Sequence, residues 1–358
     1  MSKLLLLDIG AGTLDLLCYD TASHTYYKAV AKSPILQIAE KATRLSGKLL
    51  VTGCEMGGGA LAGILRQKAE EQEVIITRSA AATLHNRMEK VSALGIKIIE
   101  DSEAAGLLAT GTYQHLQTAD LNLEQIKNLV LGLGIPFEFD LIAVCAQDHG
   151  LAPAGRSHLD FRHDLFKQAL DRNPFPDALL YAADEIPAPF SRLRAIAQSA
   201  RLIPAKEIFV MDSGMAAILG ATLDPIARTK KNRMVLDIAT SHTLGAVLEQ
   251  KELLGFFEYH TRDMTLERLQ KLLPDLADGK ITHERILAEG GHGAYLRKSL
   301  GFDAVQAIVA TGPKRALLHR SRLTLVWGAP LGDNMMTGTT GLLEAVRRRK
   351  GWPEMDFF

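Results

Sequence analysis

The feature that most constrains the fold is a strand–turn–strand pattern that occurs near the N-terminus and again late in the chain. The first copy, LLLLDIGAGTLDLLCYD, is apolar up to Asp8, turns through residues 10–13 and then resumes its apolar pattern. The second, MVLDIATSHTLGAVLEQ, is apolar up to Asp237 and resumes after Thr243. Apolar runs joined by a short turn predict β-hairpins. Two hairpins with an aspartate at the same position predict a duplicated core around one cleft.

Composition narrows the class of protein. The chain has 358 residues, enough for two domains, with 47% hydrophobic residues and a formal net charge of zero,. This balance disfavours a disordered chain or a basic nucleic-acid-binding surface. The chain has no apolar stretch of the ~18 residues that a membrane span needs, and the leucines before Asp8 are too few for a signal peptide,. We expect a cytoplasmic protein with no nucleic-acid or membrane partner.

The remaining apolar patterns alternate between strand and helix periods, which predicts an α/β fold. Strands are expected at residues 3–9, 13–19, 48–52, 73–76, 96–99, 140–146, 207–211, 233–238, 243–249, 304–310 and 323–327. Helices are expected at residues 60–71, 80–93, 102–108, 123–132, 163–170, 192–200, 215–221, 266–273 and 336–349. The polar stretch 224–232 precedes the second hairpin, so we place one domain, with inserted segments, at 1–225 and the other at 226–358,. Residues 173–189 carry four prolines and are expected to form a loop-rich connection.

The first hairpin has the residue types that phosphate binding requires. Glycines at Gly10 and Gly12 let the backbone approach a ligand closely, and successive amides in such a turn can form an anion-binding nest,. Thr13 adds a hydroxyl donor. Asp8 and Asp15 could hold a magnesium ion through its water molecules,. The alternative is an ordinary hairpin with a glycine-rich turn.

These motifs resemble the actin-like ATPase superfamily, which includes sugar kinases, heat-shock chaperones and actin. DIGAGTLD resembles its first phosphate motif, and DIATSHT falls where the second belongs. Residues 212–221 and 332–345 resemble its two connecting helices, and residues 308–318 its adenosine loop. The resemblance implies two ribonuclease-H-like domains around a central cleft that binds ATP and Mg²⁺. It implies that Asp8 organises metal-bound water. The implied nucleotide-binding residues are Gly10, Gly12, Thr13, Asp237, Ser241, Thr243 and Gly312.

The chain departs from that pattern at two turns. Ala239, Thr240 and Ser241 stand where the second phosphate turn usually has glycines, and each Cβ narrows the approach of a ligand to the backbone,. Gly312 is followed by Pro313, which lacks an amide donor,. Two hypotheses follow: an enzyme that acts as a Mg-ATP-dependent phosphotransferase or ATPase, and a non-catalytic protein that binds a ligand or regulates a partner.

A second resemblance is narrower. GCEMGGGAL, CAQDHG and SHT resemble an uncharacterised prokaryotic family labelled "putative pyruvate formate-lyase activating enzyme". The label alone suggests an activator with a protein partner. Such an activator holds an iron–sulfur cluster with a CxxxCxxC motif, whereas Cys18, Cys54 and Cys145 are isolated from one another,. We therefore expect no iron–sulfur cluster and no radical chemistry.

Four other segments could carry function. Asp148 and His149 follow an apolar strand and are candidates for a general base or a metal ligand on the substrate side of the cleft, although a structural loop role is an alternative,. Residues 56–59, MGGG, could bind an anion before a helix but more often form a tight turn,. GGHG, residues 290–293, is interpreted as a loop between helices whose His292 could face the cleft. The polar cluster at 156–164 would suit an anionic substrate, but we interpret it as solvated loop and helix-start residues. The basic run 347–350, outside these four segments, is interpreted as a solvated helix end,.

Overall fold

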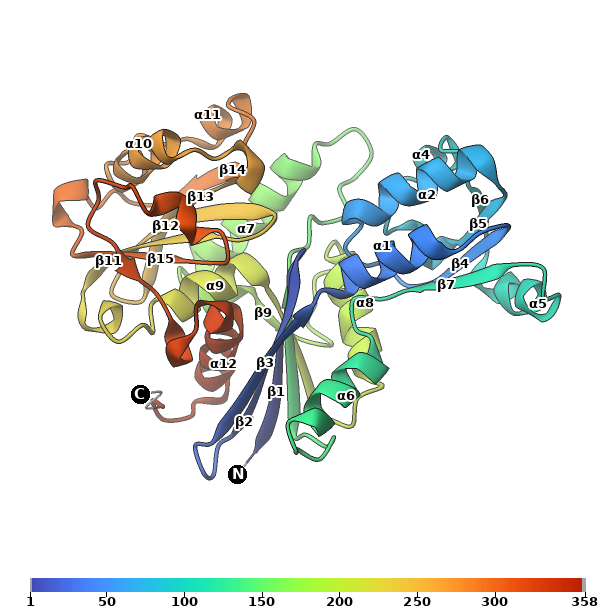
Figure 1. The fold of residues 1–358 in the computed structure, drawn as a ribbon. Helices are drawn as coiled ribbons and strands as arrows, with labels where there is room; N and C mark the ends of the chain where they lie inside the picture. The colour runs from blue at the N-terminus through green and yellow to red at the C-terminus, as the bar shows by residue number, and fades with distance from the viewer. Residues whose placement is uncertain (1, 356–358) are drawn as a thin grey trace.

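The computed structural model describes residues 2–355, in which three β-sheets are surrounded by helices (Figure 1). The first sheet has the order β3-β2-β1-β8-β10-β9. Its first three strands are antiparallel neighbours, and β8 and β10 continue the sheet parallel to β1. The strands are β1 (Lys3–Ile9), β2 (Thr13–Asp20), β3 (Tyr26–Lys32), β8 (Leu141–Ala146), β9 (Leu180–Ala182) and β10 (Glu207–Asp212).

The second sheet repeats this arrangement, with the order β14-β13-β12-β11-β15-β16. The strands β13, β12 and β11 are again antiparallel neighbours, and β15 and β16 continue the sheet parallel to β11. The strand β14 adds a further antiparallel neighbour at the other side of β13. The strands are β11 (Asn232–Ile238), β12 (His242–Glu249), β13 (Glu252–His260), β14 (Gly293–Leu296), β15 (Ala307–Thr311) and β16 (Val326–Trp327). The shared strand order is ribonuclease-H-like, and it confirms the predicted pair of ribonuclease-H-like units built on two hairpins.

A third, parallel sheet is inserted between β3 and the helix α6 (Leu123–Gly132), and it projects to one side in Figure 1. It has its own apolar core, in which Leu49, Val51, Ile76 and Leu116 are fully buried. Its strands have the order β6-β5-β4-β7: β4 (Leu49–Gly53), β5 (Val74–Thr77), β6 (Lys97–Ile99) and β7 (Gln114–Thr118). Its helices are α1 (Pro34–Arg44), α2 (Gly59–Glu71), α3 (Arg78–Ala81), α4 (Met88–Ser92) and α5 (Ala104–Ala109).

Two helices of small residues join the large sheets. These helices, α9 (Ser213–Ala221) and α12 (Thr337–Lys350), correspond to the segments predicted to connect the two halves. They pack at backbone distance: a Cβ on Gly220 would lie 1.9 Å from the carbonyl oxygen of Thr337, and one on Gly341 would lie 1.8 Å from that of Ala216. Only glycine fits at either position.

The helix α7 (His158–Arg172) makes a further connection, because it follows β8 of the first sheet and packs against β14 of the second (Figure 1). The Tyr295 hydroxyl donates to Asp171 Oδ1 at 2.9 Å, and the rings of His163 and His283 stack with centroids 3.7 Å apart. The remaining α-helices are α8 (Ser191–Ala200), α10 (Leu266–Ala277) and α11 (His283–Ala288).

Some local predictions were wrong. The helix expected at 80–93 is split into α3 and α4, because Thr83 between them bonds Met56 N and Cys54 O and so holds the chain against the neighbouring turn. The expected loop at 173–189 contains β9. The basic run at the end of α12 is solvated only in its last two residues: Arg349 and Lys350 are exposed, whereas Arg347 is 7% exposed and pairs with Glu344. Arg348 pairs with Asp177.

The proposed domain boundary at 225/226 separates the sequences of the two large sheets. The helices α7 and α12 cross that division in space, so the extents of the domains stay a prediction. No helix between residues 2 and 355 is both long and apolar enough to cross a membrane.

Candidate functional site

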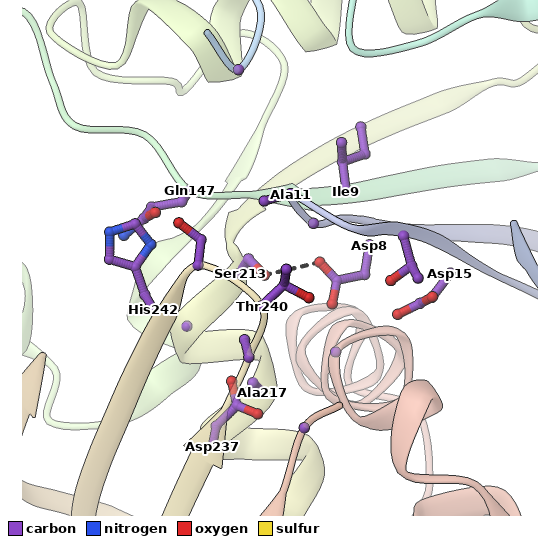
Figure 2. Close-up of a pocket in the computed structure, with 18 of the residues that line it drawn as sticks. Asp8, Ile9, Ala11, Asp15, Gln147, Ser213, Ala217, Asp237, Thr240 and His242 are labelled. Carbon is purple, nitrogen blue, oxygen red and sulfur yellow. Dashed lines mark hydrogen bonds between the residues drawn. The ribbon is translucent and has the colours of Figure 1, made fainter. Parts of the chain in front are cut away.

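The two hairpin turns face each other across a cleft of about 240 Å³ that both large sheets line (Figure 2). The turns nearly touch, because a Cβ on Gly12 would lie 2.9 Å from Thr240 Oγ1 of the opposite turn. Of the predicted nucleotide-binding residues, five line this cleft: Gly10, Thr13, Asp237, Ser241 and Gly312. Gly12 is not among the lining residues and instead faces Thr240 of the opposite turn. Thr243 does not: it is fully buried, with its hydroxyl 3.0 Å from that of Thr261.

Three aspartates bring negative charge to the cleft. Asp8 and Asp15 are directly opposite each other on β1 and β2, and Asp237 occupies on β11 the position that Asp8 has on β1. The Ser213 hydroxyl, at the start of α9, donates to Asp8 Oδ1 at 2.9 Å (Figure 2). Asp15 Oδ1 is buried and accepts no hydrogen bond. A buried carboxylate oxygen without a partner is unfavourable, so this oxygen is available to a ligand.

The same three carboxylates resist ionisation. Burial raises the pKa of Asp8 to about 6. Burial and the charge of Asp8 raise the pKa of Asp15 to about 8 and that of Asp237 to about 7. Each carboxylate therefore gains if a cation enters the cleft and offsets the charge of its neighbours.

The turns themselves are closed by matching backbone hydrogen bonds. The Gly10 amide donates to the Thr13 carbonyl at 2.9 Å, and the Ala239 amide donates to the His242 carbonyl at 3.0 Å. These two amides are thus used inside the hairpins. Gly312 has φ of 87°, and a Cβ there would lie 2.7 Å from Asp237 Oδ1, so this position requires glycine for structural reasons alone,.

The predicted Asp148–His149 pair is divided by the fold. Asp148 is 3% exposed, and its two carboxylate oxygens accept from the amides of Gly150 and Leu193 at 2.8 and 3.0 Å. It therefore holds the loop after β8 to the first turn of α8 and does not reach the cleft. His149 lines the cleft with its side chain exposed there, and desolvation by the surrounding protein lowers the pKa of its imidazole to about 3.

A buried ion-pair network lies beneath His149. Arg162 of α7, expected to be solvated, is 6% exposed and donates to Glu258 Oε2 at 2.5 Å and to Asp212 Oδ2 at 3.2 Å. The charge of Arg162 holds the pKa of Glu258 well below its usual range, although burial alone would raise it. Because Glu258 is on β13, this network joins the two halves of the molecule.

Four histidines gather beside this network, and only His149 was selected from the sequence as a site residue. His242 and His260 are paired directly across β12 and β13, and His292 immediately precedes β14. The expectation that GGHG links two helices was wrong, because β14 begins at Gly293, while His292 lies in this cluster. The histidines lie far apart in the sequence, so only the strand pairing of β12 and β13 could have linked two of them.

The MGGG turn borders the opposite side of the cleft, through residues 57–59 at the start of α2. It forms the tight strand–helix turn that was expected. The Gly57 amide donates to Asp120 Oδ1 at 3.3 Å, and Arg192 binds both oxygens of the Asp120 carboxylate at 2.8 Å. Arg192 also lines the cleft and adds positive charge to this wall.

The three cysteines do not lie together in one cluster. Cys18 and Cys145 are buried on β2 and β8, and Cys54 follows β4 in the inserted sheet. Between residues 2 and 355, no group of three potential metal ligands includes a cysteine. The residues present thus do not fit an iron–sulfur cluster.

Two ribonuclease-H-like halves around a cleft, joined by α9 and α12, define the actin-like ATPase fold. The chain belongs to the family described as "Putative pyruvate format-lyase activating enzyme (DUF1786)", whose model matches residues 56–317. No curated protein matches it.

Solved structures that resemble it include the PilM-PilN type IV pilus biogenesis complex, with 12% identity, a TM-score of 0.43 and coverage of 96% of this chain and 98% of that chain. The ethanolamine utilization protein EutJ from Carboxydothermus hydrogenoformans has 10% identity, a TM-score of 0.36 and coverage of 96% and 89%. A ROK hexokinase from Thermus thermophilus has 13% identity, a TM-score of 0.28 and coverage of 98% and 90%. The fold assignment rests on the strand order of the two sheets.

Proposed function

We propose that the protein binds a magnesium–nucleoside triphosphate, with ATP as the first candidate, between its two hairpin turns and acts as a phosphotransferase or ATPase. The observation that carries the proposal is the set of three carboxylates, Asp8, Asp15 and Asp237, at the lips of two matched hairpins. Their raised pKa values and the unpartnered oxygen of Asp15 indicate a site that gains from a cation.

Magnesium fits these residues. It prefers oxygen ligands and keeps several of its waters, so the carboxylates need not meet at one point. Asp8 and Asp15 would hold the hydrated ion, with Asp8 fixed by Ser213, and Asp237 would face it from the second half. When bound, the ion offsets charge that develops on a transferring phosphoryl group.

The chain supplies phosphate donors mainly from the first turn. Since the Gly10 amide is used within the hairpin, we assign the phosphate contacts to the backbone that follows it and to the Thr13 hydroxyl. The remaining walls suit a small anionic substrate, which the start of α2 and Arg192 would face,. His149 stands between these regions and is our candidate for contact with the substrate.

Thermal unfolding with and without Mg-ATP tests the proposal. We expect Mg-ATP to raise the melting temperature of the wild-type protein and to leave Asp8→Asn unchanged. Asp184→Asn is the matched control, because Asp184 is exposed and outside the cleft, and it should respond like the wild type. No shift of the wild-type protein at millimolar Mg-ATP, or an equal shift in Asp8→Asn, would rule the site out.

One observation favours a second candidate, a non-catalytic ligand-binding or partner-regulating protein. The Thr240 side chain fills the space opposite Gly12, where glycine would leave room for a phosphate. Turnover separates the candidates: steady Mg-ATP hydrolysis or transfer by purified protein that Asp8→Asn abolishes supports the enzyme. Binding of Mg-ATP without turnover, in the presence of candidate acceptors, supports the second.

A further inference from the structure

The histidines beside the cleft come from four separate segments. His149 follows β8 of the first sheet, whereas His242, His260 and His292 belong to the edge of β12, β13 and β14 in the second. The rings of His242, His260 and His292 have centroids 4.3 to 4.8 Å apart, and the ring of His149 lies 6.0 Å from that of His242. Imidazoles from both halves of the molecule thus form one cluster beside the cleft, in which His149, His242 and His292 are grouped most closely as possible metal ligands.

Their nitrogen atoms are close enough to share an ion. One nitrogen from each of His149, His242 and His292 lies within 4.8 Å of the other two, and the Nε2 atoms of His260 and His292 are 3.1 Å apart. Bonds of about 2.0–2.1 Å in a tetrahedral zinc site place ligand nitrogens roughly 3.4 Å from one another. Small side-chain rotations therefore suffice to bring three or four nitrogens to that spacing.

Ordinary hydrogen bonding does not account for the cluster. His242 Nε2 is buried and makes no hydrogen bond, whereas His292 contacts His260 through Nε2 and faces Glu258 through Nδ1. Buried polar atoms of this kind are few in folded proteins and call for a bound water, an ion or a partner. The unpartnered nitrogen of His242 therefore points to a ligand that accepts a nitrogen lone pair.

The surroundings provide the carboxylate that metal-bound histidines usually have. Glu258, 1% exposed, places Oε1 at 3.6 Å from His292 Nδ1, and the same oxygen accepts from the Gln147 side chain. Its other oxygen is fixed by Arg162. A carboxylate behind an imidazole sets its orientation and increases its strength as a ligand. Arg162 carries one positive charge, and it pairs with two carboxylates, those of Glu258 and Asp212. The ionised network therefore has an excess of negative charge, which a nearby cation would offset.

We propose that His149, His242 and His292 bind a divalent transition-metal ion of the zinc class. His260 is the neighbouring imidazole that completes the site, and Glu258 is a positioning residue that orients His292. Imidazole suits zinc and the other late transition metals, whereas magnesium prefers oxygen, so this site is chemically distinct from the aspartates of the same cleft. Because His149 belongs to one half and the other ligands to the second, the bound ion links the two sides of the cleft.

The test uses the full-length protein after treatment with a chelator. Titration with Co²⁺ in the absence of nucleotide should give the visible absorption of nitrogen-bound cobalt, saturating at one equivalent, and Zn²⁺ should displace it. His149→Ala, on an exposed loop, and His242→Ala should each weaken binding at least tenfold. Glu258→Gln should weaken it ~10–100-fold, as the loss of a carboxylate behind a ligand does.

His319→Gln is the matched control, since His319 is exposed on the second half and outside the cluster, and it should bind one equivalent like the wild type. Melting temperatures without metal show whether each variant is folded. If His242→Ala or Glu258→Gln is unfolded, metal binding by His149→Ala alone tests the proposal. Absence of the cobalt spectrum in the wild type, or a spectrum and affinity unchanged in both alanine variants, would overturn the proposal. Because no nucleotide is present, this result is independent of the Mg-ATP experiment.

Discussion

At the scale of single residues, the clearest consequence of the cleft is the behaviour of Asp15. Its pKa is about 8 in the folded protein, far above that of an unfolded aspartate, so folding favours its protonated form,. Stability from this preference is full at low pH and is lost as pH rises through 8. Between pH 7 and pH 9 we expect Asp15 alone to reduce the free energy of unfolding by about 1 kcal/mol.

Chemical denaturation of wild type and Asp15→Asn at these two pH values measures the effect. The asparagine cannot ionise, so its stability should decline less over the same interval. His149 and His242 of the cleft do not contribute, because their lowered pKa values keep them neutral throughout this range. Magnesium should reduce the decline in the wild type. Equal declines in both proteins without magnesium would contradict the raised pKa.

A second residue-scale prediction concerns Thr240, whose side chain closes the second turn against Gly12. Thr240→Gly restores the residue type usual at such a phosphate turn and removes the obstruction. We expect Mg-ATP to bind about fivefold more tightly, equivalent to ~1 kcal/mol, in titration calorimetry. Thr25→Gly, in the exposed turn between β2 and β3 of the first sheet and outside the cleft, should leave the affinity unchanged. Weaker binding by Thr240→Gly would instead make the threonine hydroxyl a ligand contact.

At the scale of elements, the packing of α9 against α12 depends on glycine. Gly220→Ala would place a methyl group 1.9 Å from the Thr337 carbonyl oxygen, which is backbone and cannot turn away. We expect the free energy of unfolding to fall by ~1–3 kcal/mol or more, as overpacked cores do. Gly63→Ala is the matched control: Gly63 is inside α2 with open space around it, and alanine there should stabilise by about 0.5–1 kcal/mol,. Denaturation of the two variants should therefore give changes of opposite sign.

The elements also show what the sequence could and could not reveal. Both hairpins, α9 and α12 were predictable because each has a continuous pattern with a clear turn or a run of small residues. The strand β13 was missed because the turn before it contains Gln250 at φ 55° in place of the usual asparagine–glycine pair,. Without β13, neither Glu258 nor His260 could be placed next to the cleft. Asp148 was misplaced for a related reason: its backbone partner Leu193 is 45 residues away.

At the scale of the whole molecule, helices connect the two halves at two places beside the cleft. The helices α9 and α12 join the halves at its base, and α7 joins them again beside the histidines. The aspartates lie near the first connection and the histidine cluster near the second. An ion at either place would draw together segments from both halves. We therefore expect binding at either site to affect how the two large sheets are positioned relative to each other.

The connection between the two halves through α7 depends on Arg162, so replacing this residue tests how the halves are held together. Arg162→Met leaves Glu258 and Asp212 buried without a cation, and loss of one partner from a buried network typically costs ~3–5 kcal/mol,. We expect a fall of that size in the free energy of unfolding. Arg156→Met is the matched control, because the pair of Arg156 with Asp164 is exposed, and it should cost less than about 1 kcal/mol,. The double variant Arg162→Met with Glu258→Gln should regain part of the loss, since one uncompensated charge is removed. Equal small effects of both arginine substitutions would show that α7 does not hold the two halves together.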